Sequence, residues 1–539
     1  MKKLFIFFLY SLLFSLPIVT FADNDILNWI NTNGGSGYDE GYSIGIDSNK
    51  NVYVTGPFTG TVDFDPSDAV YNLSSLGGVD TFITKFDNWG NFIWVKKVGG
   101  SGDDRSFSMA VDSDGNSYTT GRFNSSNADF DPGENTYNLA TSGSNDVYIV
   151  KLDTNGNFLW AKKLGGTNWE WPYALSIDSS GNVYTTGGFY GTADFDPGAP
   201  IYNLTASGGS PASYDDVFIS KLDTNGNFLW AKQLGGSSYD WGVFVAVSSD
   251  GDVYTTGGFS GTADFDPSAS TYNLTSTGSY DVFISKLDTN GNFLWAKKVG
   301  GTGEDYGNGL DANSSDGSLY ITGLFSGTAD FDPSASVSNM ISSGSYDNFV
   351  LKLDSSGNFI WSKKTGGTGQ DWGYTTKSRV ENGNIYIYTG GTFSSTADFD
   401  PGNDTYNLVS NGSYDNFVLK LDSSGNFIWA HGFGGNSDDW LNYFVLDPDL
   451  GVYLTGSFIG TADLDPGDLT RSIISAGDSD IFFMKLANDI TPPSITEFDV
   501  PEVYASLNLP VSLVAEDNVD VVSYIISENN IEPLPDDPS

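Results

Sequence analysis

The sequence contains no cysteine and a single histidine, His431. The absence of cysteine excludes disulfides and thiolate metal sites, so stability must come from packing. With one histidine, a Ser-His-Asp arrangement could form only around His431. We therefore predict that the protein is not an enzyme. A glycan-cleaving pair of carboxylates is the remaining catalytic alternative.

Basic residues are also scarce. The chain has 24 Lys and Arg against 68 Asp and Glu, and its formal net charge is −44. Such a charge repels nucleic acid and anionic membrane surfaces. It suits a cation or a neutral partner such as a glycan, and we expect no nucleic-acid partner.

Long hydrophobic runs are absent apart from one, Leu4 to Phe21, which follows Lys2 and Lys3. Ala22 then supplies a small residue of the kind that signal peptidases recognise. We interpret residues 1–22 as a signal peptide and predict an exported protein, extracellular or at a bacterial cell surface. No second run is long enough to cross a bilayer, so we expect no membrane insertion after signal cleavage.

A repeat of about 66 residues fills most of the remaining chain. It is marked by the tetrapeptide Asp-Phe-Asp-Pro, which reads Asp-Leu-Asp-Pro in its last copy. The seven copies begin at Asp63, Asp129, Asp194, Asp264, Asp330, Asp398 and Asp463. Periods of this length are typical of solenoids and propellers.

A second marker, Gly-Asn-Phe-(Leu/Ile)-Trp, shows how the repeats close. It occurs six times, with its tryptophan at Trp94, Trp160, Trp230, Trp295, Trp361 and Trp429. The seventh copy is missing after the last repeat, but Trp29 near the N-terminus has the same spacing to a Gly-Gly pair. The N-terminal segment therefore supplies the strand that the last repeat lacks, which a closed ring requires and a linear solenoid does not.

Each repeat reads as four short strands rich in Val, Ile, Tyr, Phe and Thr, separated by Gly, Asn and Asp turns. In the third repeat we expect these strands at Tyr173–Asp178, Asn182–Phe189, Asp216–Asp223 and Asn227–Leu234. The sequence thus predicts an all-β fold. Residues 23–489 should form a monomeric seven-bladed β-propeller of four-stranded antiparallel blades, closed by its N-terminal strand.

Most of the Lys residues fall in the third and fourth strands of the repeats. Lysine on an outermost strand discourages edge-to-edge pairing between sheets. We therefore expect a basic outer rim, with most of the acidic residues on the two loop faces.

The segments Gly-Gly-Ser-Gly-Asp-Asp at 99–104 and Ala-Val-Asp-Ser-Asp-Gly-Asn-Ser-Tyr-Thr-Thr-Gly at 110–121 carry a family resemblance. They resemble the bacterial SBBP, or seven-bladed β-propeller, repeat. Less complete copies lie at 165–187, 235–257 and 434–456, and the resemblance covers roughly residues 26–486. It implies export and a propeller fold, and it brings no catalytic residues with it.

The repeat stops before Thr491. The segments at 491–496 and 515–519 resemble the start of a bacterial immunoglobulin-like module. A whole sandwich of this kind needs about 100 residues. Residues 490–539 are therefore predicted to be a partial Ig-like segment or a disordered tail, and we favour a fragment of a longer chain.

The loop that enters the innermost strand of each blade holds the candidate site. Four residues after its Gly-Gly pair, every repeat has an acid: Asp39, Asp104, Glu170, Asp240, Asp305, Asp371 and Asp439. The next position holds Glu40, Arg105, Trp171, Trp241, Tyr306, Trp372 and Trp440. Both columns should approach the mouth of the central channel, where they could bind a sugar, a protein or a cation. Alternatively, the acids accept backbone N–H groups and the aromatics pack between blades.

Calcium is the one cofactor that the sequence leaves open, because Asp39, Asp104, Asp240, Asp305, Asp371 and Asp439 supply the hard oxygen ligands that it prefers. The Asp-Phe-Asp-Pro loops offer similar ligands. Their paired aspartates could instead cap a turn.

Two repeats break the symmetry of this face. Trp169 adds a second tryptophan beside Trp171, and Gly208 to Ala212 form an insertion in the same repeat. Arg105 and Arg122 occur together in the repeat before it. We predict a surface binding or adhesion module with an extracellular glycan or protein as its partner. The alternative is a structural spacer in a longer surface protein.

Overall fold

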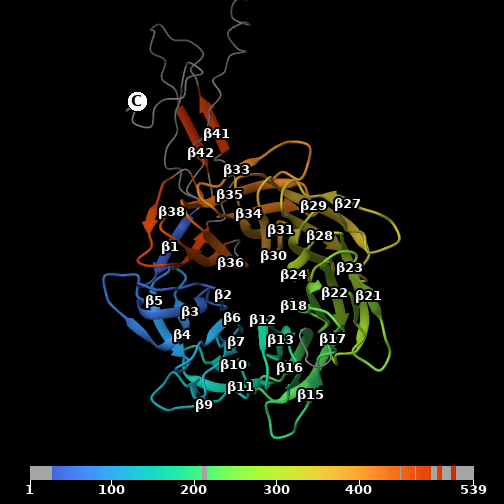
Figure 1. The fold of residues 1–539 in the computed structure, drawn as a ribbon. Coiled ribbons are helices and arrows are strands. Elements are labelled where there is room, and N and C mark those ends of the chain that lie inside the picture. Colours follow the sequence, from blue (N-terminus) through green and yellow to red (C-terminus); the bar gives the residue numbers. More distant parts are fainter. Residues whose placement is uncertain are drawn as a thin grey trace, which may run out of the picture. The chain divides into compact units, whose positions relative to one another are not determined.

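The computed structural model describes residues 27–208, 215–448, 451–467 and 469–486, together with the backbone of two later strands. Residues 27–466 and 470–486 form one compact unit. It is a ring of seven four-stranded antiparallel blades, with the innermost strands around a common centre (Figure 1). The prediction of an all-β seven-bladed propeller is confirmed.

The strands of the blades follow the chain from the centre outward. The first, innermost strands are β2 (Ser43–Ile46), β6 (Arg105–Val111), β12 (Glu170–Ile177), β18 (Asp240–Val247), β24 (Asp305–Ala312), β30 (Asp371–Glu381) and β36 (Asp439–Leu446). The second strands are β3 (Val52–Asp63), β7 (Ser117–Phe123), β13 (Val183–Phe189), β19 (Val253–Phe259), β25 (Leu319–Phe325), β31 (Asn384–Phe393) and β37 (Val452–Phe458).

The outer half of each blade has the same order. The third strands are β4 (Asn72–Phe86), β10 (Asp146–Leu152), β16 (Asp216–Leu222), β22 (Asp281–Leu287), β28 (Asp347–Leu353), β34 (Asp415–Asp422) and β40 (Asp480–Leu486). The fourth are β5 (Phe92–Val98), β11 (Phe158–Gly166), β17 (Phe228–Gly236), β23 (Phe293–Gly301), β29 (Phe359–Gly367), β35 (Phe427–Gly435) and β1 (Leu27–Asn33).

In the third repeat, the four predicted strands are found within about three residues of their expected ends. The largest difference is at β12, which begins at Glu170 because that residue already pairs with Phe189 of β13. The acid and aromatic columns therefore lie at the start of the innermost strands.

The N-terminal strand closes the ring as expected. β1 pairs antiparallel with β40, from Leu27 opposite Leu486 to Asn33 opposite Ile481. Trp29 donates its indole N–H to the carbonyl of Asn88 in blade one, 3.0 Å away. The first and last parts of the propeller thus share one sheet, and that sheet is tied to blade one.

A short hairpin lies between the second and third strands, and the Asp-Phe-Asp-Pro tetrapeptide ends its first strand and begins its turn. In most repeats this hairpin is separate: β8 (Ala128–Asp129) with β9 (Asn138–Leu139), β14 (Thr192–Asp194) with β15 (Asn203–Thr205), β20 (Thr262–Asp264) with β21 (Asn273–Thr275), β26 (Thr328–Asp330) with β27 (Asn339–Ile341), β32 (Thr396–Asp398) with β33 (Asn407–Val409), and β38 (Thr461–Asp463) with β39 (Ser472–Ile474). In the first repeat it is continuous with β3 and β4.

The tetrapeptide has a structural task in each copy. Asp264 accepts the backbone N–H groups of Asp266 and Tyr272 at 3.0 and 2.8 Å, so it caps the turn. Phe265 is fully buried against Phe283. The same hairpin pairs with the end of the preceding blade, where Gly235 lies opposite Asp264. The motif therefore joins neighbouring blades.

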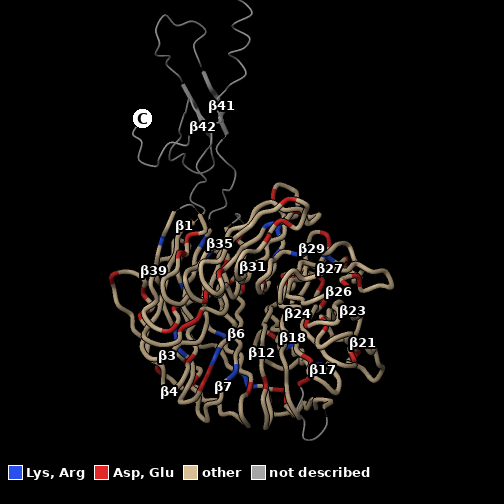
Figure 2. Tube along the Cα trace, turned by 45° about the horizontal axis from the view of Figure 1, so that its top comes forward, with Lys and Arg blue, Asp and Glu red and all other residues tan. Residues whose placement is uncertain are grey.

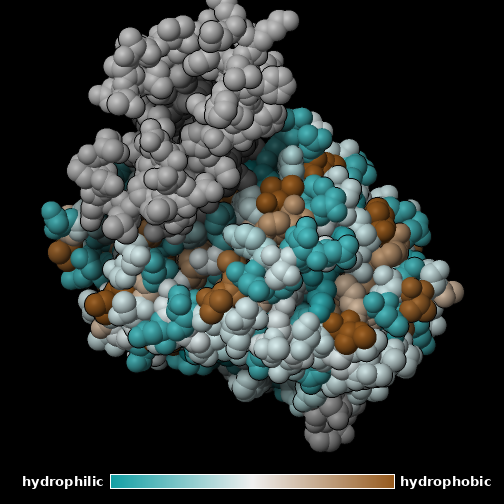
Figure 3. Space-filling model, turned by 90° about the horizontal axis from the view of Figure 1, so that it is seen from above, coloured by the Kyte–Doolittle hydropathy of each residue, from teal (hydrophilic) through white to brown (hydrophobic). Residues whose placement is uncertain are grey.

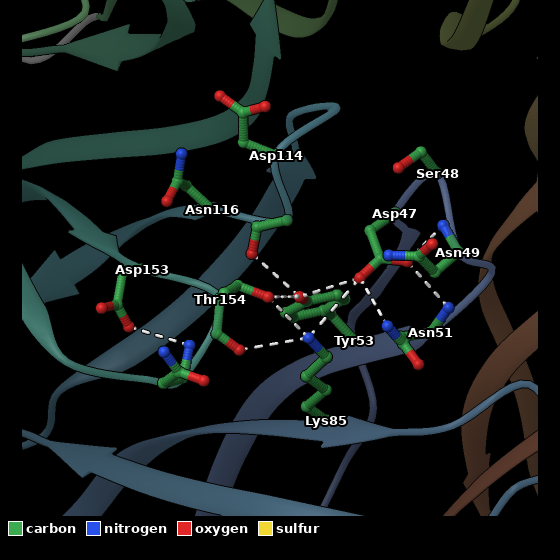
Figure 4. A network of polar contacts seen from close by, with 12 residues as sticks. Asp47, Ser48, Asn49, Asn51, Tyr53, Lys85, Asp114, Asn116, Asp153 and Thr154 are labelled. Carbon is green, nitrogen blue, oxygen red and sulfur yellow. Dashed lines mark hydrogen bonds and ion pairs between the residues drawn. The ribbon is translucent and has the colours of Figure 1, made fainter.

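Lysines of the third strands form a second connection between blades. Lys85 lies over the ring of Tyr53 and donates to the carbonyl and the hydroxyl of Thr154, in the next blade's outer hairpin, at 3.1 and 2.8 Å (Figure 4). Trp94 donates to the same carbonyl at 3.2 Å. Both donors thus hydrogen-bond to a turn of the neighbouring blade, whose carbonyl would otherwise lack these bonds.

This connection corrects the expectation of a basic rim. Five lysines of the third strands are buried: Lys85, Lys151, Lys221, Lys352 and Lys420. In most of these blades the third strand directs its lysine toward the next blade, so the side chain is buried between blades and does not lie on the outer rim. Figure 3 shows one side of the propeller, where hydrophobic side chains form separate patches among hydrophilic ones.

Beyond the propeller, β41 (Ser494–Asp499) and β42 (Ser512–Glu516) form an antiparallel hairpin. The signal peptide predicted at 1–22 and most of the Ig-like segment predicted at 490–539 lie outside the described residues, as do residues 209–212 of the insertion. The domain boundaries at 23 and 489 stay predictions. In the described part of the chain, no helix has the length and hydrophobicity needed to cross a membrane.

Candidate ligand-binding face

The acid column lies at the start of the innermost strands, and all seven of its side chains are buried: Asp39, Asp104, Glu170, Asp240, Asp305, Asp371 and Asp439. Each accepts a backbone N–H from its own Gly-Gly pair. Asp305, for example, accepts from Gly301 at 2.7 Å and from Ser326 at 3.2 Å. These carboxylates hold the loops that form the channel mouth.

A second ring of acids, which we did not predict, lies beside the first. It has one aspartate from each third strand, which is the first residue of the strand in six blades and lies in the middle of β4 in blade one: Asp80, Asp146, Asp216, Asp281, Asp347, Asp415 and Asp480. Asp281 Oδ1 and Asp305 Oδ2 both lie within 2.9 Å of the point where a β-carbon on Gly300 would stand. Only a glycine leaves room for such a pair, and Gly300 also has a φ of +145°. The sequence feature that could have predicted this second ring is the aspartate that recurs in the third strand of every repeat.

One oxygen of every acid in this second ring is left without a hydrogen bond. The Oδ1 atoms of all seven are buried and unpartnered. Their Oδ2 atoms accept loop N–H groups, such as that of Thr277 for Asp281 at 2.9 Å. A proton shared within each pair would satisfy the remaining oxygen.

The pKa values agree with proton sharing. Burial raises the pKa of Asp305 to about 7, and the nearby Asp281 adds to this effect. Burial likewise raises the pKa of Asp240 to about 8, with a contribution from Asp216. The pKa of Glu170 is also raised to about 8, mainly by burial and further by the nearby Asp146. Burial and the neighbouring carboxylate therefore both favour the protonated form of these first-ring acids.

The calcium prediction for the acid column stays a prediction. Calcium takes about six to eight oxygen ligands. Two carboxylates meet at each junction, and each of them already accepts a backbone N–H group with at least one oxygen. Among the residues that the structure describes, no group of three or more His, Cys, Asp or Glu side chains is placed to hold a metal ion.

The aromatic column forms clusters around the channel mouth. Trp241 stacks on Tyr280 with ring centroids 5.2 Å apart, and on Tyr306 of the next blade at 6.3 Å. Trp372 lies 5.8 Å from Trp440 and 5.4 Å from Tyr414. All of these rings are partly buried. The tyrosines just before the second acid ring, which we did not single out, complete the clusters.

Blades two and three differ from this pattern, as the sequence indicated. Arg105 takes the aromatic position of blade two, 5.4 Å from the ring of Tyr38. Arg122 lies 3.8 Å from the ring centroid of Trp171. Trp169 stacks on Trp171 at 6.3 Å and is 50% exposed. The two arginines and two tryptophans therefore form one continuous surface.

The channel is narrowed by side chains from opposite blades. Phe244 of blade four stacks on Tyr443 of blade seven, with centroids 6.2 Å apart. Lys377 Nζ lies 5.3 and 5.4 Å from these two rings. These three side chains therefore meet across the centre of the ring.

The single histidine lies away from this face. His431 is on β35, the outermost strand of blade six, with its ring 4.8 Å from that of Trp429. It is in the position that a lysine holds in most repeats, as expected. The acids of the channel mouth recur in every blade, so no single catalytic pair stands out among them.

Fold and site together define a seven-bladed β-propeller with an acidic and aromatic channel mouth. Residues 93–131 match the family model of the SBBP β-propeller repeat. An uncharacterized WD repeat-containing protein of Acanthamoeba polyphaga mimivirus is 24% identical over 518 residues, which is 80% of this chain and 36% of that protein. The regulatory protein FlaEY of Caulobacter vibrioides is 26% identical over 181 residues, 32% of this chain and 18% of its own length.

The chain thus spans about a third or less of the length of these relatives. Among solved structures, Sqt1 from Chaetomium thermophilum bound to the N-terminus of ribosomal protein L10 covers 86% of this chain and 100% of its own, with a TM-score of 0.40 and 11% identity. A rhamnogalacturonan lyase of Bacillus licheniformis covers 85% of this chain and 76% of its own, with a TM-score of 0.26 and 11% identity. These likenesses concern the fold alone.

Proposed function

We propose that the protein is a binding scaffold whose channel mouth recognises a segment of another protein. The observation that supports this most is the collection of partly buried Trp, Tyr and Arg side chains on that face. These three residue types dominate the binding energy of protein interfaces. Rings that stack on one another are also held in place before binding, which lowers the entropy lost on association.

The position of the face adds to the proposal. It is made of the loops that enter the innermost strands, while the propeller below provides a rigid support. The pair of Phe244 and Tyr443 narrows the channel beneath it. A peptide segment lying across the mouth would meet the Trp241 and Trp372 clusters on one side and the two arginines on the other.

A glycan is the second candidate, because Trp169 is half exposed and stacked on Trp171. An exposed indole of this kind is a suitable platform for a sugar ring. The proposal further includes export to the cell exterior, which is based on the hydrophobic run at residues 4–21. It includes no catalytic step. A structural spacer is the alternative that would need no ligand at all.

The test is a selection of random peptides displayed on phage against the immobilised full chain. We expect enriched sequences whose affinity falls at least tenfold in the variant Trp241→Ala/Trp372→Ala, which is about 1.4 kcal/mol. The matched control is Tyr272→Ser, which changes a tyrosine in the turn between β20 and β21 that is 40% exposed. The fifth repeat has Ser338 at the equivalent place, so the control should fold.

Peptides that bind both variants equally would place the interface elsewhere and overturn the proposal. A glycan array with the same samples examines the second candidate. Glycan binding that is lost in Trp169→Ala/Trp171→Ala, without any peptide enrichment, would replace the protein partner by a sugar. If neither peptides nor glycans bind, the structural-spacer alternative is favoured.

A further inference from the structure

Arg105 and Arg122 are cross-strand partners on β6 and β7, so two positive charges lie side by side. Neither guanidinium makes a hydrogen bond or an ion pair within the described part of the chain, and both Nε atoms are buried without a partner. Leaving such donors unsatisfied is unfavourable. The arrangement therefore suggests a group that is missing from the free protein.

The surrounding blades explain how this place arose. In blades three and four, the residues that correspond to Arg122 are Gly188 and Gly258, and the next blade's Trp241 and Tyr306 lie directly over them. In blade two, Arg122 fills that space beneath Trp171 at 3.8 Å. The guanidinium is thus held by stacking, and its N–H groups have no hydrogen-bond partner in the described part of the chain.

The nearby acids attract the pair, but none of those that the structure describes forms an ion pair with it. Burial raises the pKa of Glu40, while the hydroxyls of Tyr38 and Tyr42 and the charge of Arg105 act in the opposite direction. Asp103 Oδ1 accepts the backbone N–H of Val79 at 3.3 Å. Burial and the neighbouring Arg105 lower the pKa of Arg122, and Asp103 opposes them. Figure 2 shows the basic residues at β6 and β7 within a ring whose other charges are mostly acidic.

We propose that Arg105 and Arg122 form a carboxylate-binding subsite for one Asp or Glu side chain of the peptide partner. The guanidinium fork matches a carboxylate in two parallel hydrogen bonds. Since the chain carries a net charge of −44, it repels polyanions such as nucleic acid or a polyuronate. A single carboxylate in an otherwise neutral or basic segment meets the two arginines without that repulsion. This subsite rests on the proposed function.

The chain has only four arginines, Arg105, Arg122, Arg379 and Arg471, so the Nε–Hε region of a 15N-arginine NMR spectrum can be assigned by substitution. We would titrate the full chain with N-acetylglutamate amide and with its uncharged analogue N-acetylglutamine amide. Saturable shifts of the Arg105 and Arg122 signals with the glutamate compound alone are expected. Arg379, bound to Glu381, and the exposed Arg471 serve as internal controls.

Equal shifts at all four arginines, or none at any carboxylate concentration, would overturn the subsite. A preference for methyl glucuronide over the glutamate compound would assign it to an acidic sugar instead. The variants Arg105→Trp and Arg122→Gly install residues that neighbouring blades already carry, and melting temperatures would confirm folding. Each should abolish the shifts of the remaining arginine.

The two proposals fail separately. Peptides selected on the wild-type chain should share an acidic position and lose at least tenfold in affinity in Arg122→Gly. If they bind that variant unchanged but still require Trp241 and Trp372, the scaffold function stands and the carboxylate subsite is wrong. If no peptide is selected but the NMR shifts occur, the subsite stands without a protein partner.

Discussion

Single carboxyl oxygens account for much of the character of the channel mouth. Asp216 Oδ1 is buried and unpartnered beside Asp240, whereas its Oδ2 accepts from Ser207 and Gln233 at 2.9 and 2.6 Å. An oxygen in this state favours a proton on its neighbour. Ionisable groups placed in this way make stability depend on pH.

The Asp216→Asn substitution measures that dependence. Burial, with a further contribution from Asp216, raises the pKa of Asp240 to about 8 in the folded protein, above the 3.8 of a free aspartate. The folded state therefore binds the proton more tightly, and this stabilisation is lost as the pH rises through about 8. An asparagine would donate to Asp240 in place of the proton. We expect it to raise stability by on the order of 1 kcal/mol near pH 9 and by little near pH 5.

Thermal unfolding from about pH 5 to 9 would show this difference. The matched control is Asp281→Asn, which also removes the partner of Lys298 at 2.6 Å and should give no gain. A lower melting temperature of Asp216→Asn across the whole range would contradict proton sharing.

At this scale the sequence predicted positions better than roles. It identified the acid and aromatic columns and the occurrence of Arg105 and Arg122 in the same repeat. It did not identify the second acid ring, because those residues follow a variable segment and precede a stretch that reads as hydrophobic. It also could not show that Arg122 replaces a glycine beneath a tryptophan, since that contact joins two blades.

Whole strands are held to their neighbours by the lysines of the third strands. Lys85 combines a ring contact with Tyr53, two hydrogen bonds to Thr154 and a 3.5 Å approach to Asp47. Lys85 is buried. Removing its charge therefore leaves Asp47 without its ion-pair partner and the Thr154 carbonyl without this hydrogen bond. Similar contacts recur at Lys151 and Lys221.

We therefore expect Lys85→Met to lower the free energy of unfolding by about 2–3 kcal/mol. Lys96→Met on β5, where the side chain is only partly buried, should cost less than about 1 kcal/mol. Urea denaturation of both variants compares the two strands directly. Equal losses would mean that the buried position of Lys85 has no special effect.

The sequence had assigned these lysines to protection of an outer edge. That interpretation used the number of Lys residues on outer strands, and it is correct only where the strand faces solvent. The third strand does not, because the outer hairpin of the next blade covers its polar positions. Such a contact between repeats has no signature within one repeat.

The complete ring depends on β1, the strand that joins both ends of the propeller. Deletion of residues 23–33 should expose the outer side of β40 and yield an aggregated or partly unfolded chain. A circular permutant that carries residues 23–35 after Leu486 restores the pairing in one continuous blade. We expect it to elute as a monomer and to melt near the wild-type temperature.

Size-exclusion chromatography and circular dichroism distinguish these outcomes. A deletion variant that remains monomeric and folded would show that the ring tolerates an open seventh blade. The number of blades and the closure itself were predictable from the sequence, since a period and a displaced tryptophan are local patterns. The narrowing of the channel by Phe244 and Tyr443 was not, because the two residues belong to opposite blades.

The pairing of Leu27 with Leu486 also affects the order of events during synthesis. β1 emerges from the ribosome before the other described strands, yet its partner β40 is completed only after all the other strands of the propeller. Long-range pairing of this kind forms slowly, and the waiting strand has an open edge. A chain that stops or is cut before β40 never obtains its last blade. Ring closure therefore depends on translation through the last repeat, since β40 alone supplies the partner of β1.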